Sequence, residues 1–469
     1  MSLYDVDVAV VGGGISGLTA ALVIADNSAA SIALLEAGSA LGGNIRTERV
    51  GDVEVEAGAD SFLARSPEGP SLARSLGLDD DLIEPNVFGA LVAYDKGRAR
   101  LPGGSVYGIP GSVRSLLASS ALSPVARLRA LSEVLTPRKL GGRDVSVGDF
   151  VTRRFGRQVL DRLVDPLLAG TRAGDVRDMS LAAALPQVDA LARRHRSLLL
   201  GIGSERRRGS IQTGTPPFLK IRSGMSKLIE TLGNRLAQRV ELRLDHPVER
   251  LQPSNGGVVL ESLEDIRARA VIFAAPAYAA SSAVESWDED AAELLGRIGY
   301  ASVASVALVY RPESIALPPD VSGLLMGRGA ARAVSAITFY SQKWGLPIED
   351  GAVLRCFVGR ADRHPALDLS DSELVSKVTS DLGSLVDVSG DPVGSNVVRW
   401  ERSLPQYSVG HLDRLAVIES RLRARGPIFL AGAGYRGSGI PDCIRQGQTA
   451  ANRVLSLLST GVDGGADLL

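Results

Sequence analysis

A glycine-rich turn near the start of the chain and an acidic residue beyond it have the types and spacing of a dinucleotide-binding site. The run Gly12-Gly13-Gly14-Ile15-Ser16-Gly17 fits the pattern G-x-G-x-x-G, and Glu36 follows Gly17 by 19 residues. In this pattern Gly12 allows a tight turn, Gly14 lets the backbone approach a pyrophosphate, and Gly17 lets a helix pack closely on a strand. A carboxylate at the position of Glu36 would bind the hydroxyls of a ribose. These residues therefore predict an adenine dinucleotide site.

The segments on either side of the turn must hold these residues in place. Residues 6–11 are rich in valine, which is typical of a buried parallel strand, and residues 18–25 favour a helix. The helix N-terminus would direct free N–H groups and the positive end of its dipole at the phosphates. A second apolar strand, residues 32–35, would end at Glu36. The alternative is a glycine turn that binds nothing, as in carrier proteins that keep this fold.

A second glycine turn, Leu41-Gly42-Gly43-Asn44-Ile45-Arg46-Thr47, follows Glu36 within a few residues. It is similar to a turn of the flavin oxidase superfamily, which contains amine oxidases, phytoene desaturases and porphyrinogen oxidases. That superfamily usually has Arg or Lys directly after the glycine pair, whereas this chain has Asn44. Arg46 is then the candidate that brings a positive charge to the pyrophosphate. The resemblance favours FAD over NAD.

The C-terminal part of the chain contains a further strand, glycine turn and helix. Residues 427–434 read as a strand entering the turn, and the helix that follows would begin near residues 439–442. In flavoenzymes such a helix N-terminus can stabilise the negative charge of the reduced isoalloxazine. We therefore expect the site to be assembled from both ends of the chain. The alternative is a C-terminal strand and helix that serve packing alone.

Composition excludes several other classes of protein. The 469 residues suggest two or three domains, and the formal net charge of −1 argues against a dedicated nucleic-acid binder. The two cysteines and four scattered histidines give neither a disulfide scaffold nor a metal site. Residues 8–25 are uncharged, but their four glycines and the acidic residues before them favour a strand, turn and helix over a membrane span or signal peptide. We expect a cytoplasmic protein, with peripheral membrane attachment as the alternative.

Motifs spread along the chain resemble those of the bacterial oxygen-dependent porphyrinogen oxidases of haem biosynthesis. The resemblance rests on Gly58-Ala59-Asp60-Ser61-Phe62-Leu63, Asp165-Pro166-Leu167-Leu168-Ala169-Gly170, Ala173-Gly174-Asp175, His195-Arg196-Ser197-Leu198, Arg399-Trp400, Leu404-Pro405-Gln406-Tyr407 with Gly410-His411, and Gly439-Ile440-Pro441-Asp442-Cys443-Ile444. From the residues alone, the stretch 191–210 is instead interpreted as a solvated basic loop.

The family implies an α/β, multidomain fold: an FAD oxidase fold of the two-dinucleotide-binding type, with a mixed-sheet substrate domain and a helical insert. The apolar strands expected at residues 303–309 and 353–358 would belong to the mixed sheet. We expect an FAD-binding domain from residues 1–88, 211–280 and 396–469, an insert that covers the substrate at residues 89–210, and a substrate-binding domain at residues 281–395.

The resemblance also implies a reaction and a set of contacts. A porphyrinogen would lose six electrons in three two-electron steps, each a hydride transfer from a bridging carbon to flavin N5, and O₂ would reoxidise the flavin to give H₂O₂. The sequence identifies no catalytic acid or base, and none is required, because the flavin would drive the hydride loss and the protein would mainly supply orientation and electrostatics. The residues expected to contact FAD are Gly12, Gly13, Gly14, Ile15, Ser16, Gly17, Glu36, Ala37, Asn44, Arg46, Gly58, Ala59, Asp60, Ser61, Val248, Trp400, Gly434, Gly439, Ile440 and Asp442. The candidate substrate contacts are Arg65, Arg100, Tyr340 and Phe357.

Two substrates fit the family, coproporphyrinogen III with four propionates and protoporphyrinogen IX with two. The resemblance is greatest to the coproporphyrinogen-oxidising enzymes of Gram-positive bacteria, and the 46 Arg against 6 Lys suit a high-GC actinobacterial origin. Coproporphyrinogen III is therefore the predicted substrate. An amine oxidase or desaturase, and a non-catalytic carrier on the same scaffold, are the more distant alternatives. The low aromatic content of 4% counts against the aromatic cage that amines prefer.

The neutral total charge conceals an uneven distribution. Between Lys96 and Arg208 there are 21 basic and 9 acidic residues, so this segment carries +12 and the remainder −13. Such an insert would attract a polyanionic tetrapyrrole or an anionic membrane. The expected partners are thus a porphyrinogen and O₂, peripheral membrane contact through the basic insert, a second copy in a homodimer, and the next enzyme of the haem pathway for hand-over.

Overall fold

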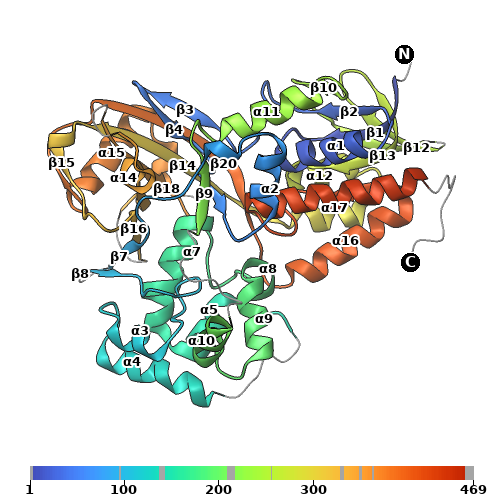
Figure 1. Ribbon diagram of the computed structural model, residues 1–469. Helices are drawn as coiled ribbons and strands as arrows, with labels where there is room; N and C mark the ends of the chain where they lie inside the picture. Colours follow the sequence, from blue (N-terminus) through green and yellow to red (C-terminus); the bar gives the residue numbers. More distant parts are fainter. Residues whose placement is uncertain are drawn as a thin grey trace.

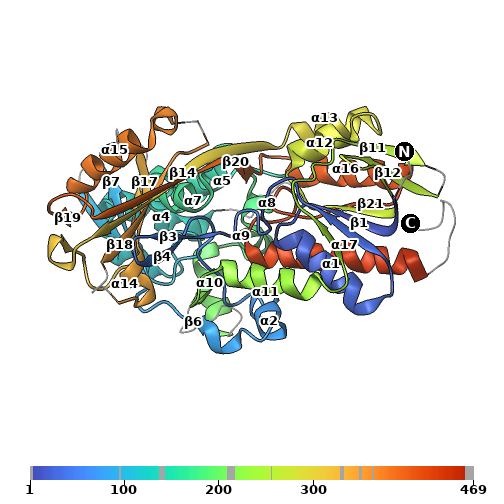
Figure 2. The same cartoon turned by 90° about the horizontal axis from the view of Figure 1, so that it is seen from above.

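The computed structural model describes residues 4–94, 97–136, 143–208, 217–254, 256–327, 332–347, 351–361 and 364–459. These residues form two sheets side by side, with a group of short helices against them (Figure 1). Seen from above, the two sheets occupy opposite halves of an elongated molecule (Figure 2). Each sheet and the helical group has its own apolar core.

The first sheet is built from both ends and the middle of the chain. Its strand order is β10-β2-β1-β13-β12-β11, and β21 also pairs with β13. The pairs that join β10, β2, β1, β13 and β21 are parallel, whereas β11 and β12 run antiparallel. The strands are β1 (Tyr4–Val11), β2 (Ile32–Leu35), β10 (Glu241–Arg243), β11 (Arg250–Ser254), β12 (Gly257–Glu261), β13 (Ile266–Phe273) and β21 (Ile428–Leu430).

Helices cover both faces of this sheet because its parallel strands are apolar on both sides. One face packs on α1 (Ile15–Asn27), α11 (Ser226–Leu236) and α17 (Ile440–Ser459). The other packs on α12 (Ala277–Val284), α13 (Glu289–Gly296) and α16 (His411–Arg425). Helix α17 lies along α1, so the last helix of the chain reaches the first glycine turn.

The second sheet has the order β20-β14-β18-β17-β16-β7-β8. Its strands are β20 (Gly394–Gln406), β14 (Gly299–Tyr310), β18 (Ala352–Val358), β17 (Val334–Phe339), β16 (Gly323–Met326), β7 (Ala90–Tyr94) and β8 (Gly97–Arg100). Helix α15 (Asp371–Gly383) packs on one face. The other face meets the hairpin of β3 (Thr47–Val50) and β4 (Val53–Glu56), α14 (Tyr340–Trp344) and α7 (Asp165–Arg172).

Smaller elements connect these parts. Strand β9 (Phe218–Ile221) pairs with β5 (Phe62–Leu63) and with β6 (Leu82–Ile83) beside α2 (Glu68–Ser75). β15 (Ile315–Ala316) pairs with β19 (Asp387–Val388). The helical group consists of α3 (Val113–Ala118), α4 (Pro124–Leu131), α5 (Val147–Phe155), α6 (Arg157–Val159), α7, α8 (Leu181–Ala184), α9 (Pro186–Arg194) and α10 (Leu198–Arg207). Single turns at Asp79–Asp81, Ser132–Leu135, Leu160–Val164, Pro312–Ser314 and Pro365–Asp368 complete the described elements.

The predicted α/β fold with a second, mixed sheet and a helical insert is confirmed. Strand β2 has the predicted bounds, and the strands expected at residues 6–11, 303–309 and 353–358 lie within β1, β14 and β18. Helix α1 is longer than expected, because its first turn begins at Ile15, inside the glycine motif.

The interpretation of residues 191–210 as a solvated loop is wrong for the described residues, which end at 208. Helix α10 forms there because Ser197 caps its N-terminus and Leu198, Leu199 and Ile202 are buried. The motif His195-Arg196-Ser197-Leu198 is thus the cap of a packed helix.

The division of the chain into five segments stays a prediction. Three strands and one helix pair or pack across its expected boundaries. Strands β7 and β8 lie in the expected insert, residues 89–210, and most of β20 lies in residues 396–469, yet all three pair in the second sheet. Helix α13 lies within residues 281–395 and packs on the first sheet. Among the described residues, no helix combines the length and apolar character needed to span a membrane.

Candidate cofactor and substrate site

The first glycine turn leaves open space in front of a helix N-terminus. A Cβ on Gly17 would overlap the carbonyl oxygen of Gly12, so only glycine lets α1 begin directly against β1. A Cβ on Gly14, in contrast, would meet no heavy atom within 4 Å. No side chain caps α1, and no acidic residue lies in its first turn. Its N–H groups are therefore available to an anion such as a pyrophosphate.

Glu36 and the second glycine turn complete the walls of this space. The Glu36 carboxylate accepts hydrogen bonds from the N–H groups of Gly13 (2.6 Å) and Gly38 (2.8 Å). The Gly42 N–H donates to the Gly13 carbonyl over 2.9 Å, so the two turns lie against each other. Each Glu36 oxygen keeps a lone pair for a ribose hydroxyl. The open space, the uncapped helix and the acid fit an adenine dinucleotide.

The loop of residues 57–61 is held by three segments that are far apart in sequence. The Ala59 N–H donates to the Asn44 carbonyl over 3.0 Å, and a Cβ on Gly58 would overlap that same carbonyl. The Trp400 indole N–H donates to the Ala57 carbonyl over 3.0 Å. The Asn44 side chain in turn donates to the Ser403 carbonyl over 3.2 Å. Asn44, Gly58 and Trp400 therefore lie together, as the FAD prediction requires.

The C-terminal turn meets the same region from the other side. A Cβ on Gly447 of α17 would overlap the Ser16 carbonyl oxygen, which shows how closely α17 and α1 approach. A Cβ on Gly434 would lie 2.5 Å from the Tyr300 hydroxyl, and burial raises the pKa of Tyr300 to about 12. At the start of α17 the Asp442 carboxylate pairs with Arg445. The C-terminal helix thus packs directly on the helix that begins at the first glycine turn.

Three other expected cofactor contacts differ in their surroundings. Arg46 is exposed and pairs with Glu48, so in this conformation its charge is already balanced. Val248 is partly buried and follows His246 by two residues. The backbone N–H of His246 donates to the Glu36 carbonyl over 2.8 Å. Ala37 directly follows Glu36 and is exposed.

Two of the four expected substrate contacts, Tyr340 and Phe357, lie beside Arg355, whereas Arg65 and Arg100 lie on other elements. Arg65 is exposed after β5, and Arg100 is half exposed on β8, where it pairs with Asp320. Tyr340 is fully buried at the start of α14, so it offers no surface to a substrate in this conformation. Phe357 is partly exposed on β18, and its ring centroid lies 4.9 Å from the Arg355 guanidinium carbon.

Sequence reasoning missed the charged residues beneath the loop of residues 57–61. Arg355 is 1% exposed and donates to the carbonyls of Gly58 (2.8 Å) and Ala57 (3.3 Å). The Lys343 ammonium donates to Asp60 over 2.7 Å. Burial alone would raise the pKa of the Asp60 carboxyl, but the nearby Lys343 and Arg355 cations outweigh it and hold the pKa well below its usual range. One signal was available: Arg355 is a single charge within the apolar run of β18.

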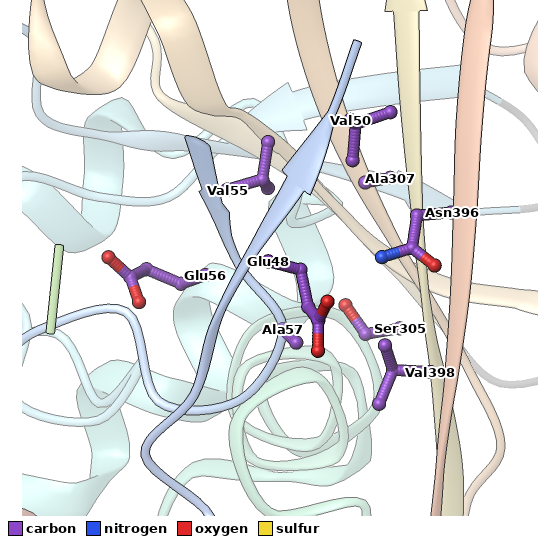
Figure 3. A pocket seen from close by; sticks show the side chains of 9 residues that line it. All are labelled: Glu48, Val50, Val55, Glu56, Ala57, Ser305, Ala307, Asn396 and Val398. Carbon is purple, nitrogen blue, oxygen red and sulfur yellow. The ribbon is translucent and has the colours of Figure 1, made fainter. Parts of the chain in front are cut away.

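A small cavity lies between the hairpin β3–β4 and the second sheet (Figure 3). Its volume is about 10 Å³, the lower limit for one water molecule. Figure 3 shows Glu48 directed towards Ser305 and Glu56 turned away from them. This cavity is too small for an organic substrate. A more open one of about 560 Å³ lies beside α14 and is lined by residues that include Arg222 and Trp344.

The helical insert reaches the C-terminal glycine turn through α7. The Arg172 guanidinium lies 3.4 Å from the Ser438 hydroxyl, and the Gln406 side chain donates to the Arg172 carbonyl over 3.0 Å. Nearby, the Ser180 N–H donates to the Tyr407 carbonyl over 2.8 Å. The motif at residues 165–175 therefore brings the insert into contact with the cofactor domain.

Comparison with known proteins agrees with this geometry. Residues 15–455 match the family of flavin containing amine oxidoreductases, and the chain belongs to that family. It is 32% identical to the coproporphyrinogen III oxidase of Bacillus subtilis (strain 168), over 96% of this chain and 98% of that protein. It is 36% identical to the coproporphyrinogen III oxidase of Mycobacterium tuberculosis (strain ATCC 25618 / H37Rv), over 97% and 98% of the two chains. A crystal structure from Exiguobacterium sp. 255-15, described as a protoporphyrinogen oxidase, superposes with a TM-score of 0.85 at 29% identity, covering 97% of this chain and all of the other.

The family confirms the predicted cofactor and class of protein. The chain is an FAD-dependent oxidoreductase, and the resemblance to porphyrinogen oxidases found in its motifs extends over nearly its whole length. The contacts of individual residues with FAD or substrate stay predictions.

Proposed function

We propose that this chain oxidises coproporphyrinogen III to coproporphyrin III, with O₂ as the final electron acceptor. The observation that carries the proposal is the 32–36% identity, over nearly the full length, to proteins named coproporphyrinogen III oxidase. The substrate loses six hydrogen atoms, and three O₂ take them up as three H₂O₂, so atoms and electrons balance. When bound, FAD accepts the two electrons of each step.

The protein's part in this reaction is to bind FAD and to orient the substrate. We assign FAD binding to residues from six parts of the chain: Gly12, Gly13, Gly14, Ile15, Ser16 and Gly17; Glu36, Ala37, Asn44 and Arg46; Gly58, Ala59, Asp60 and Ser61; Val248; Trp400; and Gly434, Gly439, Ile440 and Asp442. The first turn would hold the pyrophosphate and Glu36 the ribose. The loop of residues 57–61 would contact the isoalloxazine.

For the substrate, the candidate surface is the face of the second sheet next to α7, where Phe357 is partly exposed among buried residues. The strand register places Phe357 beside Ser305 and Ala336, and Ala336 beside Leu325. Phe357 is the candidate that contacts the tetrapyrrole ring, with Tyr340 buried nearby on the same face. Arg65 and Arg100 are the candidates that bind propionates.

Part of the basic excess of the insert comes from arginines that make contacts within the insert itself. Arg154 is buried against Glu133 at 2.6 Å, and Arg129 donates to the carbonyls of Arg153 (2.7 Å) and Arg154 (3.0 Å) at the end of α5. The remaining exposed arginines would steer the tetra-anionic substrate towards the site. We then expect kcat/KM for coproporphyrinogen to fall as salt is added, and a salt-independent kcat/KM would contradict steering.

The decisive experiment is anaerobic reduction of the bound flavin, followed at its visible absorbance band, with each porphyrinogen in turn. We expect coproporphyrinogen III to reduce the flavin and to have the higher kcat/KM. A preference for protoporphyrinogen IX, the substrate suggested by the description of the Exiguobacterium structure, would overturn the substrate assignment alone. Reduction by amines would indicate an amine oxidase. A colourless protein that cannot be reconstituted with FAD would indicate a carrier.

The insert also presents an apolar surface that suits a membrane. Among the described residues, five of the insert's six exposed large hydrophobic side chains lie on α3, α4 and the turn after α4: Val113, Leu117, Val125, Leu128 and Leu135. Exposed arginines such as Arg114 lie among them. We propose peripheral contact with anionic membranes through this surface. Wild-type protein should sediment with anionic vesicles, and Leu128→Asp should remove that sedimentation. Equal sedimentation of the two would contradict the proposal.

A further inference from the structure

Five charged side chains, three of them buried and two partly buried, lie where the hairpin β3–β4, β9, α14 and β18 meet. Their exposed side-chain fractions are at most 19%, and Glu56, Lys220 and Arg355 are at most 3% exposed. We call the five residues the charged joint: Glu56, Asp60, Lys220, Lys343 and Arg355. Within it, Glu56 pairs with Lys220, and Asp60 lies between Lys343 (2.7 Å) and Arg355 (3.8 Å).

A contribution to stability alone does not explain why five charged side chains lie together here. Buried ion pairs often contribute less than well-packed apolar residues would, because the charges must leave water. Two buried donor groups around the charged joint also have no hydrogen-bond partner among the described residues: the Trp344 indole N–H and the Nε of Arg355. Such expensive polar groups are concentrated at functional sites.

The charged joint is connected directly to the loop of residues 57–61. Arg355 donates to the carbonyls of Ala57 and Gly58, and Lys343 donates to the carboxylate of Asp60. The joint contains two carboxylates and three cations, so it leaves one positive charge in excess. Because the site is buried, this charge is weakly screened and acts on groups beside the loop.

We propose that the excess positive charge of the charged joint makes reduction of the bound FAD more favourable, and that Lys343 is the residue that supplies it. This inference rests on the FAD contact of residues 57–61 proposed above. FAD gains negative charge on reduction, so a buried cation nearby favours the reduced form. Lys343 and Arg355 are positioning residues, which act through the loop and through their field.

The test is the midpoint potential of bound FAD, measured against a reference dye without any porphyrinogen. Lys343→Met removes a positive charge and should disfavour reduction at least tenfold, a shift of about 30 mV to more negative potential for a two-electron couple. Asp60→Asn removes a negative charge and should shift the potential in the opposite direction. Lys343→Arg keeps the positive charge, so its midpoint potential should equal that of the wild-type protein.

Lys377→Met is the matched control, since Lys377 pairs with Asp381 on α15, which covers the opposite face of the second sheet. It should leave the potential unchanged. Shifts of the same sign in Lys343→Met and Asp60→Asn, or shifts below threefold in both, would overturn the proposal. Loss of FAD or of the fold in either variant, with normal FAD in Lys377→Met, would also overturn it, since the joint would then only build the site. A wrong substrate assignment would leave these potentials unaffected.

Discussion

The indole nitrogen of Trp400 donates a 3.0 Å hydrogen bond to the carbonyl of Ala57, across 343 positions of sequence. The same carbonyl also accepts from Arg355. The long strand β20 thereby holds the loop that the flavin prediction places against the isoalloxazine. Trp400 is thus a link between the second sheet and the cofactor site.

Replacing Trp400 by Phe keeps an aromatic ring but removes this hydrogen bond. A hydrogen bond of this kind contributes about 0.5–1.5 kcal/mol, so we expect the Kd for FAD to rise about 2- to 10-fold. Titration of the apoprotein with FAD, followed by flavin fluorescence, measures it. Trp287→Phe is the control, because its buried indole N–H has no hydrogen-bond partner in the described structure. An equal rise in the Kd for FAD in both variants would show that the Trp400 hydrogen bond to Ala57 has no specific role in FAD binding.

Gly14 and Gly17 lie in the same turn but should respond to alanine in different ways. Gly14→Ala points a methyl into open space at a φ of −73°, so the apoprotein should keep its stability while FAD affinity falls at least tenfold. Gly17→Ala forces a methyl against the Gly12 carbonyl and should lower the free energy of unfolding by about 1–3 kcal/mol. Urea unfolding of the apoproteins and FAD titration separate the two effects. Normal FAD binding by Gly14→Ala would contradict a phosphate site there.

Glu36→Gln tests the assignment of the ribose site. Hydrogen bonds to charged groups contribute about 1.5–3 kcal/mol, so the Kd for FAD should rise about 10- to 150-fold. The Kd for FMN, which lacks the adenosine that Glu36 would bind, should stay unchanged. Glu230→Gln on the exposed side of α11 is the matched control. Equal losses of FAD and FMN affinity in Glu36→Gln would show that the turn itself has been disrupted.

The local site elements could be predicted because each depends on a short run of sequence. The turn at Gly12, the strand ending at Glu36 and the helix near Ile440 are determined by glycine spacing and apolar runs. Asn44, Gly58 and Trp400 were placed at the cofactor by family resemblance alone, and the structure shows that they lie together.

The parts that could not be predicted depend on tertiary pairing. Tyr340 was expected beside the substrate, but β17 turns into α14 at that position and buries it. Glu56 and Lys220 form a pair across 164 positions, and no local pattern indicates which buried charges will meet. The strands β7 and β8 lie at the start of the expected helical insert, and only the pairing of β7 with β16 and of β8 with β7 reveals that they extend the second sheet.

His411 should make the stability of the protein depend on pH. The ring is fully buried, and its Nε2 lies 2.7 Å from the Tyr435 carbonyl. A carbonyl only accepts, so Nε2 carries the proton and Nδ1 would need a second one to charge the ring. Nδ1 has no hydrogen-bond partner among the described residues. Burial, with Arg414 and Arg436 nearby, lowers the pKa of His411 below its usual value of about 6.5.

Because the folded pKa is the lower one, the unfolded chain binds the proton first as pH falls. The contribution of His411 is therefore fully present above about pH 6.5 and is lost below it, by up to about 1.4 kcal/mol per pH unit until the folded pKa is reached. Urea unfolding between pH 5.5 and 7.5 measures this slope. His411→Gln can still donate to the Tyr435 carbonyl but cannot titrate, so its slope should be smaller than that of the wild-type protein. Identical slopes in the two proteins would mean that other groups control the acid sensitivity.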